Sequence, residues 1–140
     1  MPAKQQSQED QEKKIELPPN IRLVTDAELI YDTPNYQTRE LAFPDQTGRT
    51  AFSITITRVK PGGQTRGHSH PELVEFYQIQ RGEGLVLLGN QAWFVKPPMC
   101  ILNQVDVYIK IINTSATDDL VFMTYMNGRY GRPDTPRKVK

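Results

Sequence analysis

Residues 62–82 have the sequence GGQTRGHSHPELVEFYQIQRG, and this stretch determines most of what the chain is expected to form. It contains His68 and His70, the only two histidines among 140 residues, and then Glu75. Residues i and i+2 of a β-strand point to the same face, so both imidazoles can approach one point. Pro71-Glu72 is a natural chain reversal, after which Glu75 can reach that point from a neighbouring strand.

Two imidazoles and one carboxylate on one face favour a divalent first-row transition metal: Fe, Mn, Ni, Co or Zn. Three protein ligands leave coordination positions for water, substrate or dioxygen. The alternative is a pair of surface histidines beside a turn, with Glu75 in solvent, because short motifs often match by accident.

The glycines around these residues extend the pattern. Gly62 precedes His68 by five intervening residues, and Gly82 follows Glu75 by six. The string G-x5-H-x-H-x4-E-x6-G resembles the first conserved motif of the cupin superfamily in every defining residue and spacing. This resemblance implies a small antiparallel jelly-roll barrel in which His68, His70 and Glu75 point inward as metal ligands. The alternative within the family is a degenerate cupin with an empty barrel.

The second cupin motif, G-x5-P-x-G-x2-H-x3-N, is matched far less well. Alignment on Asn113 places Ile109 at the histidine and Asp106 at the second glycine, and only the asparagine remains. Isoleucine cannot bind a metal, so three protein ligands are left. We expect Ile109 to face the metal from the opposite wall of the barrel. Asp106 is expected to form a turn, and Tyr108, of opposite strand parity, to point outward.

Short strand patterns separated by turns fill the middle of the chain. We expect a hairpin at Gly89-Asn90, a short helix at residues 25–30, and strands at 51–59, 73–80, 84–88, 92–95, 105–113 and 120–126. Many strands with little helix and no repeat predict an all-β protein, and the first-motif resemblance selects a single cupin jelly-roll β-barrel. We assign residues 18–127 to this domain, 1–17 to a disordered N-terminal tail and 128–140 to a basic C-terminal tail.

Composition is that of an ordinary globular protein, with 37% hydrophobic residues, 24% charged residues and a net charge of +1. The single Cys100 cannot form an internal disulfide, and its apolar neighbours predict a buried position. Neither a signal peptide nor a long apolar run is apparent, so we expect a cytoplasmic protein with no membrane association.

The basic C-terminal segment raises the question of partners. The near-neutral overall charge and the lack of a nucleic-acid-binding motif favour a solvated tail, or an arm on a partner subunit, over a nucleic-acid contact. We therefore expect no nucleic-acid partner. Because a single barrel exposes sheet edges that pairing can cover, we expect a homodimer.

Strand parity extends the site to two candidate catalytic residues. Arg66 shares the face of His68 and His70, and Tyr77 shares that of Glu75. A guanidinium and a phenol near a metal would orient a small anionic or carbonyl-bearing molecule. The alternatives are a solvated loop arginine and a barrel-wall tyrosine. Two functions follow: a metal-dependent enzyme of isomerase, lyase or oxygenase type, or a non-catalytic binding or sensory module.

Overall fold

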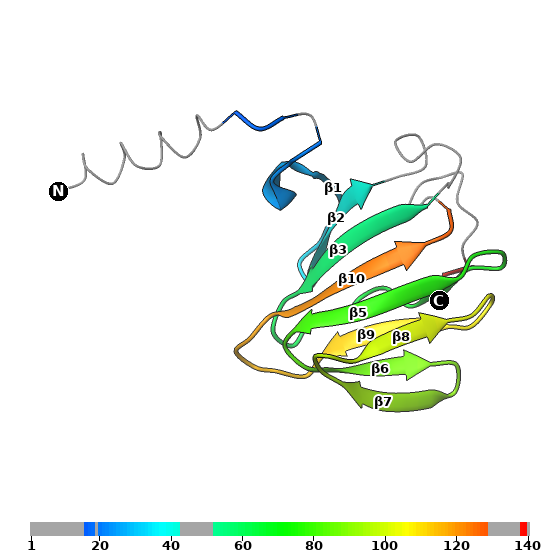
Figure 1. Ribbon diagram of the computed structural model, residues 1–140. Helices are drawn as coiled ribbons and strands as arrows, with labels where there is room; N and C mark the ends of the chain where they lie inside the picture. The colour runs from blue at the N-terminus through cyan, green and yellow to red at the C-terminus, as the bar shows by residue number, and fades with distance from the viewer. Residues whose placement is uncertain (1–15, 19, 43–51, 129–137, 140) are drawn as a thin grey trace.

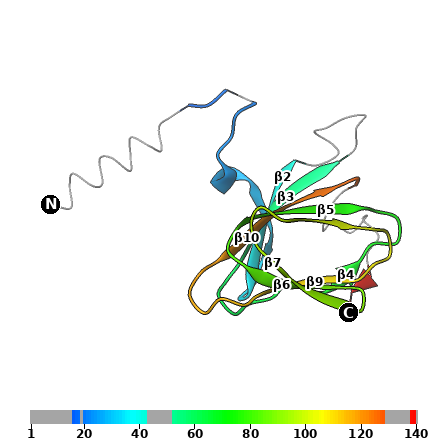
Figure 2. The same ribbon diagram turned by 60° about the horizontal axis from the view of Figure 1, so that its bottom comes forward.

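The computed structural model describes residues 16–18, 20–42, 52–128 and 138–139, and most of them lie in two antiparallel β-sheets (Figure 1). The six-stranded sheet has the order β1 (Glu28–Asp32), β2 (Tyr36–Ala42), β3 (Ser53–Val59), β10 (Leu120–Met126), β5 (Glu75–Arg81) and β8 (Cys100–Asn103). The five-stranded sheet has the order β11 (Lys138–Val139), β4 (His68–Ser69), β9 (Ile109–Asn113), β6 (Gly84–Leu88) and β7 (Gln91–Val95). Figure 2 shows the two sheets facing each other as layers.

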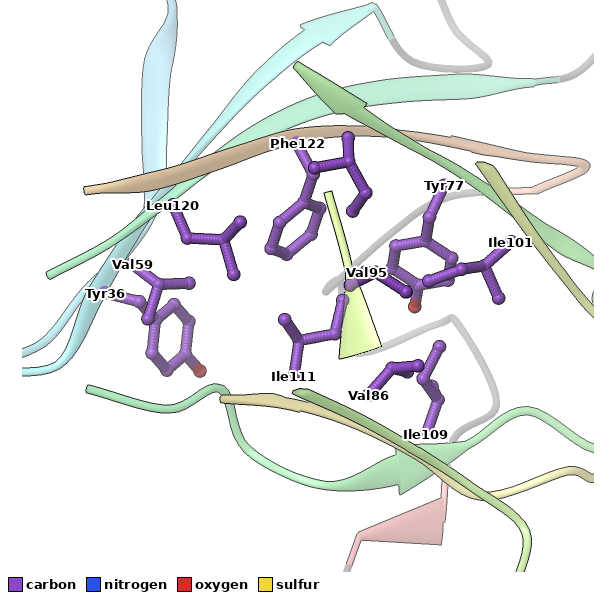
Figure 3. Close-up of a cluster of buried hydrophobic side chains, with 11 residues drawn as sticks. Tyr36, Val59, Tyr77, Val86, Val95, Ile101, Ile109, Ile111, Leu120 and Phe122 are labelled. Atoms are coloured by element: carbon purple, nitrogen blue, oxygen red, sulfur yellow. The ribbon is translucent and has the colours of Figure 1, made fainter. Parts of the chain in front are cut away.

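A hydrophobic core fills one part of the space between the sheets. Figure 3 shows Val59 and Leu120 of the six-stranded sheet pointing toward Ile111 of the five-stranded sheet, and all three are at most 1% exposed. Alternation along each strand produces this core, because every second side chain of β3 and β10 is buried.

Toward the other end of the six-stranded sheet, the inward side chains become polar. Along β3 the buried residues change from Val59 to threonines and then to Ser53, and along β5 they change from Ile79 to Glu75. On β8 the change is from Ile101 to Asn103. Strand register places these polar ends in one region: Glu75 pairs directly with Asn103, and Met126 separates Glu75 from Ser53. One end of the interior is therefore built for polar contacts.

The two outer glycines of the predicted motif have backbone reasons for their identity. Gly62 and Gly82 adopt positive φ angles of 71° and 82°. At Gly82 a side chain would also be blocked, because a Cβ would lie 2.4 Å from the carbonyl oxygen of Asp119. The predicted hairpin is present, with Gly89 at φ 59° between β6 and β7.

Several local predictions need correction. Residues 25–30 are not a helix: a 3-10 turn at Val24–Asp26 leads into β1, whose residues pair with β2. Cys100 is exposed because it lies on the outward face of β8. The predicted strand at 105–113 is shorter, since residues 105 and 106 form a turn and β9 begins at Ile109. The strand β2 was not predicted from the sequence.

The tails lie mostly outside the described residues, including 1–15 of the N-terminal segment and 129–137 and 140 of the C-terminal one. Within the C-terminal segment, the backbone of β11 pairs with β4, so Val139 lies opposite His68. No helix in the described part of the chain is long and apolar enough to cross a membrane.

Candidate metal centre

His68, His70 and Glu75 converge at the polar end of the interior. The Nε2 atom of His68 lies 3.3 Å from one carboxylate oxygen of Glu75, and Nε2 of His70 lies 3.6 Å from the other. One ligand atom from each of the three residues lies within 4.8 Å of the others, and none of the three is more than 5% exposed. The structure therefore brings together the three residues predicted from the motif.

Each of these side chains is placed by a different part of the fold. His68 is on the two-residue strand β4 and pairs with Ile109 of β9 in the five-stranded sheet. His70 follows β4 directly, and its carbonyl oxygen accepts a 2.6 Å hydrogen bond from the backbone N–H of Asp106. Glu75 is the first residue of β5 in the six-stranded sheet. The site therefore lies between the two sheets.

Hydrogen bonding prepares His68 for coordination. Its Nδ1 lies 3.1 Å from the carbonyl oxygen of Arg66, which can only accept, so Nδ1 carries the proton and donates. The lone pair of Nε2 is therefore directed at the carboxylate side of the site. This arrangement, in which a backbone carbonyl fixes the tautomer of a ligating histidine, is common around protein-bound metals.

The carboxylate of Glu75 is maintained as an anion. Burial alone would raise its pKa, but in the metal-free protein hydrogen bonding and charge from the protonated forms of His68 and His70 outweigh burial and lower the pKa from 4.5 to about 2. Both carboxylate oxygens are buried, and no described residue donates a hydrogen bond of ordinary geometry to either.

The spacing of these atoms fits a divalent metal better than direct hydrogen bonds. Charge-assisted N–H···O bonds are usually about 2.7–2.9 Å long, shorter than both distances here. Two ligand atoms that each lie about 2.1 Å from a common ion are about 3.0 Å apart when the ligand–metal–ligand angle is a right angle, and about 3.4 Å apart in tetrahedral coordination. The three residues could therefore hold an ion whose charge would offset the buried carboxylate.

Arg66 and Tyr77, the predicted catalytic residues, line one cavity together with His68. Its volume is about 10 Å³, room for about one water. Tyr77 is buried and its ring packs 5.7 Å from that of Phe122, whereas Arg66 is exposed. Both residues therefore line the cavity, Tyr77 from a buried position and Arg66 from an exposed one.

Both sheets contribute to this cavity. Thr38 and Thr57 of the six-stranded sheet line it, and their hydroxyls lie 2.8 Å apart. Ile109 and Ile111 of the five-stranded sheet also line it, beside His68. The cavity lining therefore combines polar and apolar side chains.

The degenerate second motif keeps its backbone geometry. Asp106, at the place of the second glycine, is the one non-glycine residue in the described part of the chain with positive φ, 59°. Ile109 points inward and is 1% exposed, but it lies beside His68 in the same sheet. The prediction that Ile109 faces the site from the opposite wall is therefore wrong with respect to His68, because the strand register places these two residues side by side on one sheet. Tyr108 is half-buried, with its hydroxyl against the backbone of Gly67.

Sequence reasoning missed Asn103, which lies directly opposite Glu75 in the β5–β8 pair and is 2% exposed. It also missed Glu40, buried at 3% and paired with Thr55 in the same polar region. The alternation of β2 around Tyr36, Thr38 and Glu40 was a usable signal for the latter. Asn103 had no local signal, because its neighbour is 28 positions away in the chain.

The sequence matches no protein-family model and no curated protein. The structure is similar to a predicted oxalate decarboxylase from Thermotoga maritima, at 17% identity and a TM-score of 0.68, over 76% of this chain and 96% of that one. It is also similar to a cupin-like protein from Thermotoga maritima, at 19% identity and a TM-score of 0.62, over 77% of this chain and 77% of that one. A third similar structure is a polyketide cyclase from Streptomyces resistomycificus, at 18% identity and a TM-score of 0.68, over 87% of this chain and 85% of that one. The chain has the cupin fold, as its first motif predicts.

Proposed function

We propose that this chain is a metal-dependent enzyme of the cupin fold, with His68, His70 and Glu75 as the ligands of one divalent transition metal. The observation that carries the proposal is the convergence of two buried imidazoles and a buried carboxylate at ligand–ligand spacing. The substrate is a small anionic or carbonyl-bearing metabolite, and the reaction is of isomerase, lyase or oxygenase type.

A bound ion would supply Lewis-acid activation of a carbonyl or stabilisation of an enediolate. The other groups belong to the protein itself. Arg66, exposed beside the cavity, would pair with a carboxylate or phosphate of the substrate. Tyr77 would present its phenol to the substrate from the buried side. The solved structures named above include proteins described as a decarboxylase and a cyclase, although their low identity supports only the shared fold.

A non-catalytic binding or sensory module is the second candidate. It is favoured by Ile109, which lies inward where the second motif has a histidine, and by the small free volume of the cavity. The enzyme is preferred because Arg66 and Tyr77 line the same cavity as His68.

Metal analysis tests the ligand assignment. Protein purified without added ions and then supplied with a panel of divalent metals should take up about one equivalent. His68→Ala, His70→Ala and Glu75→Ala should each abolish stoichiometric uptake, because each removes one of only three ligands. Glu72→Ala changes an exposed carboxylate next to the motif and serves as the control. A wild type that binds none of the metals, or a His68→Ala variant that keeps a stoichiometric ion, would contradict the proposal.

A ligand screen separates the two functions. The metal-loaded protein is screened by thermal shift against small organic acids and sugar phosphates, and each stabilising compound is then incubated with it and followed by NMR. An enzyme converts at least one such compound and loses this conversion in Glu75→Ala. Stabilisation without conversion of any compound would favour the binding module.

We also propose that the chain forms a homodimer. Apolar side chains cross the outer face of the six-stranded sheet in one row: Leu102 pairs with Phe76, Phe76 with Tyr125, and Tyr125 with Ile54. Leu102 is 56% exposed and Phe76 is 36% exposed. A contiguous apolar surface of this kind is often covered by a second copy of the chain.

A further inference from the structure

Asn103 is the polar residue nearest to Glu75 across the six-stranded sheet. The two residues are directly paired between β5 and β8, and directly opposite residues of an antiparallel pair point to the same face. Both are buried, Glu75 at 0% and Asn103 at 2% exposure. The side chain of Asn103 therefore projects into the same interior space as the Glu75 carboxylate.

The turn between β8 and β9 fixes the orientation of the Asn103 amide. Its Nδ2 donates a 3.1 Å hydrogen bond to the carbonyl oxygen of Val107, which leaves Oδ1 on the other side of the amide. The same turn is attached to the metal site, because the N–H of Asp106 donates to the carbonyl oxygen of His70. One turn thus positions both Asn103 and His70.

Oδ1 of Asn103 is a buried acceptor to which no described residue donates a hydrogen bond. The carboxylate oxygens of Glu75, its neighbour, are in the same condition. Buried acceptors side by side are stable only when a donor or a cation lies between them. Glu75 would contact the ion directly. The side chain of Asn103 is one methylene shorter than that of Glu75 and starts from the adjacent strand, so an indirect contact through a hydrogen-bond donor suits it better than direct coordination.

We propose that Oδ1 of Asn103 accepts a hydrogen bond from a water of the metal's coordination shell, or from the substrate hydroxyl that displaces this water. Asn103 is then a positioning residue on the six-stranded sheet, on the same side of the site as Glu75. The inference rests on the proposed metal site and adds a polar contact that neither histidine nor Glu75 provides.

Two substitutions separate this role from a purely structural one. Asn103→Leu removes both the acceptor and the Nδ2 bond to Val107. Asn103→Asp keeps an acceptor oxygen, loses the bond to Val107 and adds a negative charge beside Glu75. Because this charge can by itself strengthen cation binding, the exchange of bound water is the decisive measurement for this variant. If Asn103 serves only to anchor the turn, both variants should be equally impaired. If the acceptor matters, Asn103→Asp should recover metal binding.

The experiment measures affinity for Mn(II) in competition with a chelator, together with ¹⁷O relaxation of water on the Mn(II)-loaded protein. We expect Asn103→Leu to bind Mn(II) about 10-fold more weakly, the size typical of an outer-shell contact, and to exchange its bound water faster. Asn103→Asp should restore both values. Cys100→Ser, on the outward face of the same strand and outside the apolar row of the proposed dimer, is the control, and circular dichroism verifies folding. If Asn103→Leu does not fold, Asn103→Ala replaces it with the same expectation.

Three results would overturn the inference. One is an Asn103→Leu variant that matches the wild type in affinity and water exchange. Another is a deficit of equal size in Asn103→Asp. The third is a loss of Mn(II) affinity in Asn103→Leu as large as that in His68→Ala, together with one fewer protein oxygen in the metal's coordination shell by X-ray absorption. This result would make Asn103 a direct ligand. A wild type that binds no divalent ion overturns the proposed function itself, and is thereby distinguished from these outcomes.

Discussion

Asn113→Ala should destabilise the protein strongly, although Asn113 does not contact the metal site. Its Nδ2 donates to the carbonyl oxygens of Val59 (3.0 Å) and Asp118 (2.8 Å), and its Oδ1 accepts from the N–H of Ser115 (2.9 Å). The side chain is 1% exposed. Three bonds at about 1 kcal/mol each, plus about 1–2 kcal/mol for leaving the buried Val59 carbonyl unsatisfied, give about 4–5 kcal/mol. This is a large fraction of the stability of a typical domain.

The assay is urea unfolding of the metal-free protein, followed by circular dichroism. Asn127→Ala is the control: its Oδ1 accepts one hydrogen bond, from the N–H of Val74, at an exposed position. We expect it to cost about 0.5–1.5 kcal/mol. A loss below about 1.5 kcal/mol in Asn113→Ala, no larger than in Asn127→Ala, would refute the argument that the surviving asparagine of the second motif is a structural anchor for β9.

Three further predictions concern the site and the surface. Ile109→His should tighten metal binding by more than about 10-fold, because residue 109 faces inward directly beside His68; unchanged affinity in a folded variant would show that the side chain cannot reach the ion. Glu75 has a pKa of about 2 in the folded protein against 4.5 as its ordinary value, so its contribution to metal-free stability is present above pH 4.5 and lost as pH falls toward 2. Urea unfolding across this pH range should therefore show that the free energy of unfolding falls more steeply with decreasing pH in the wild type than in Glu75→Gln. Equal pH dependence in the two proteins would argue against the pairing of Glu75 with the histidines. Phe76→Lys should convert a dimer into a monomer by light scattering, whereas a wild type that is monomeric at all practical concentrations would exclude the dimer.

The sequence was sufficient to predict the convergence of the three site residues. Two-residue periodicity put His68 and His70 on one face, and the chain reversal after them returned Glu75 to the same point. The strand at 120–126 was predicted with the bounds that β10 has, because its alternation is regular and no glycine or proline interrupts it. These successes depend on neighbours in the sequence.

The failures depend on partners that are distant in the chain. Thr25-Asp26-Ala27-Glu28-Leu29-Ile30 has a helix-like cap and spacing, yet β1 forms there because it pairs with β2. Cys100 lies in an apolar run that suggested burial, but register with Gln78 of β5 places it on the outer face. Asn103 could not be recognised without the β5–β8 register, since nothing in its own surroundings marks it.

The small volume of the cavity limits how a ligand can bind. With room for about one water, the cavity can admit only a single small group of a ligand, such as a hydroxyl or a carbonyl oxygen. The rest of a larger molecule would stay outside, where the exposed Arg66 could contact it. Recognition would then depend on one end of the ligand, and compounds that share this end would compete for the site whatever the rest of their structure.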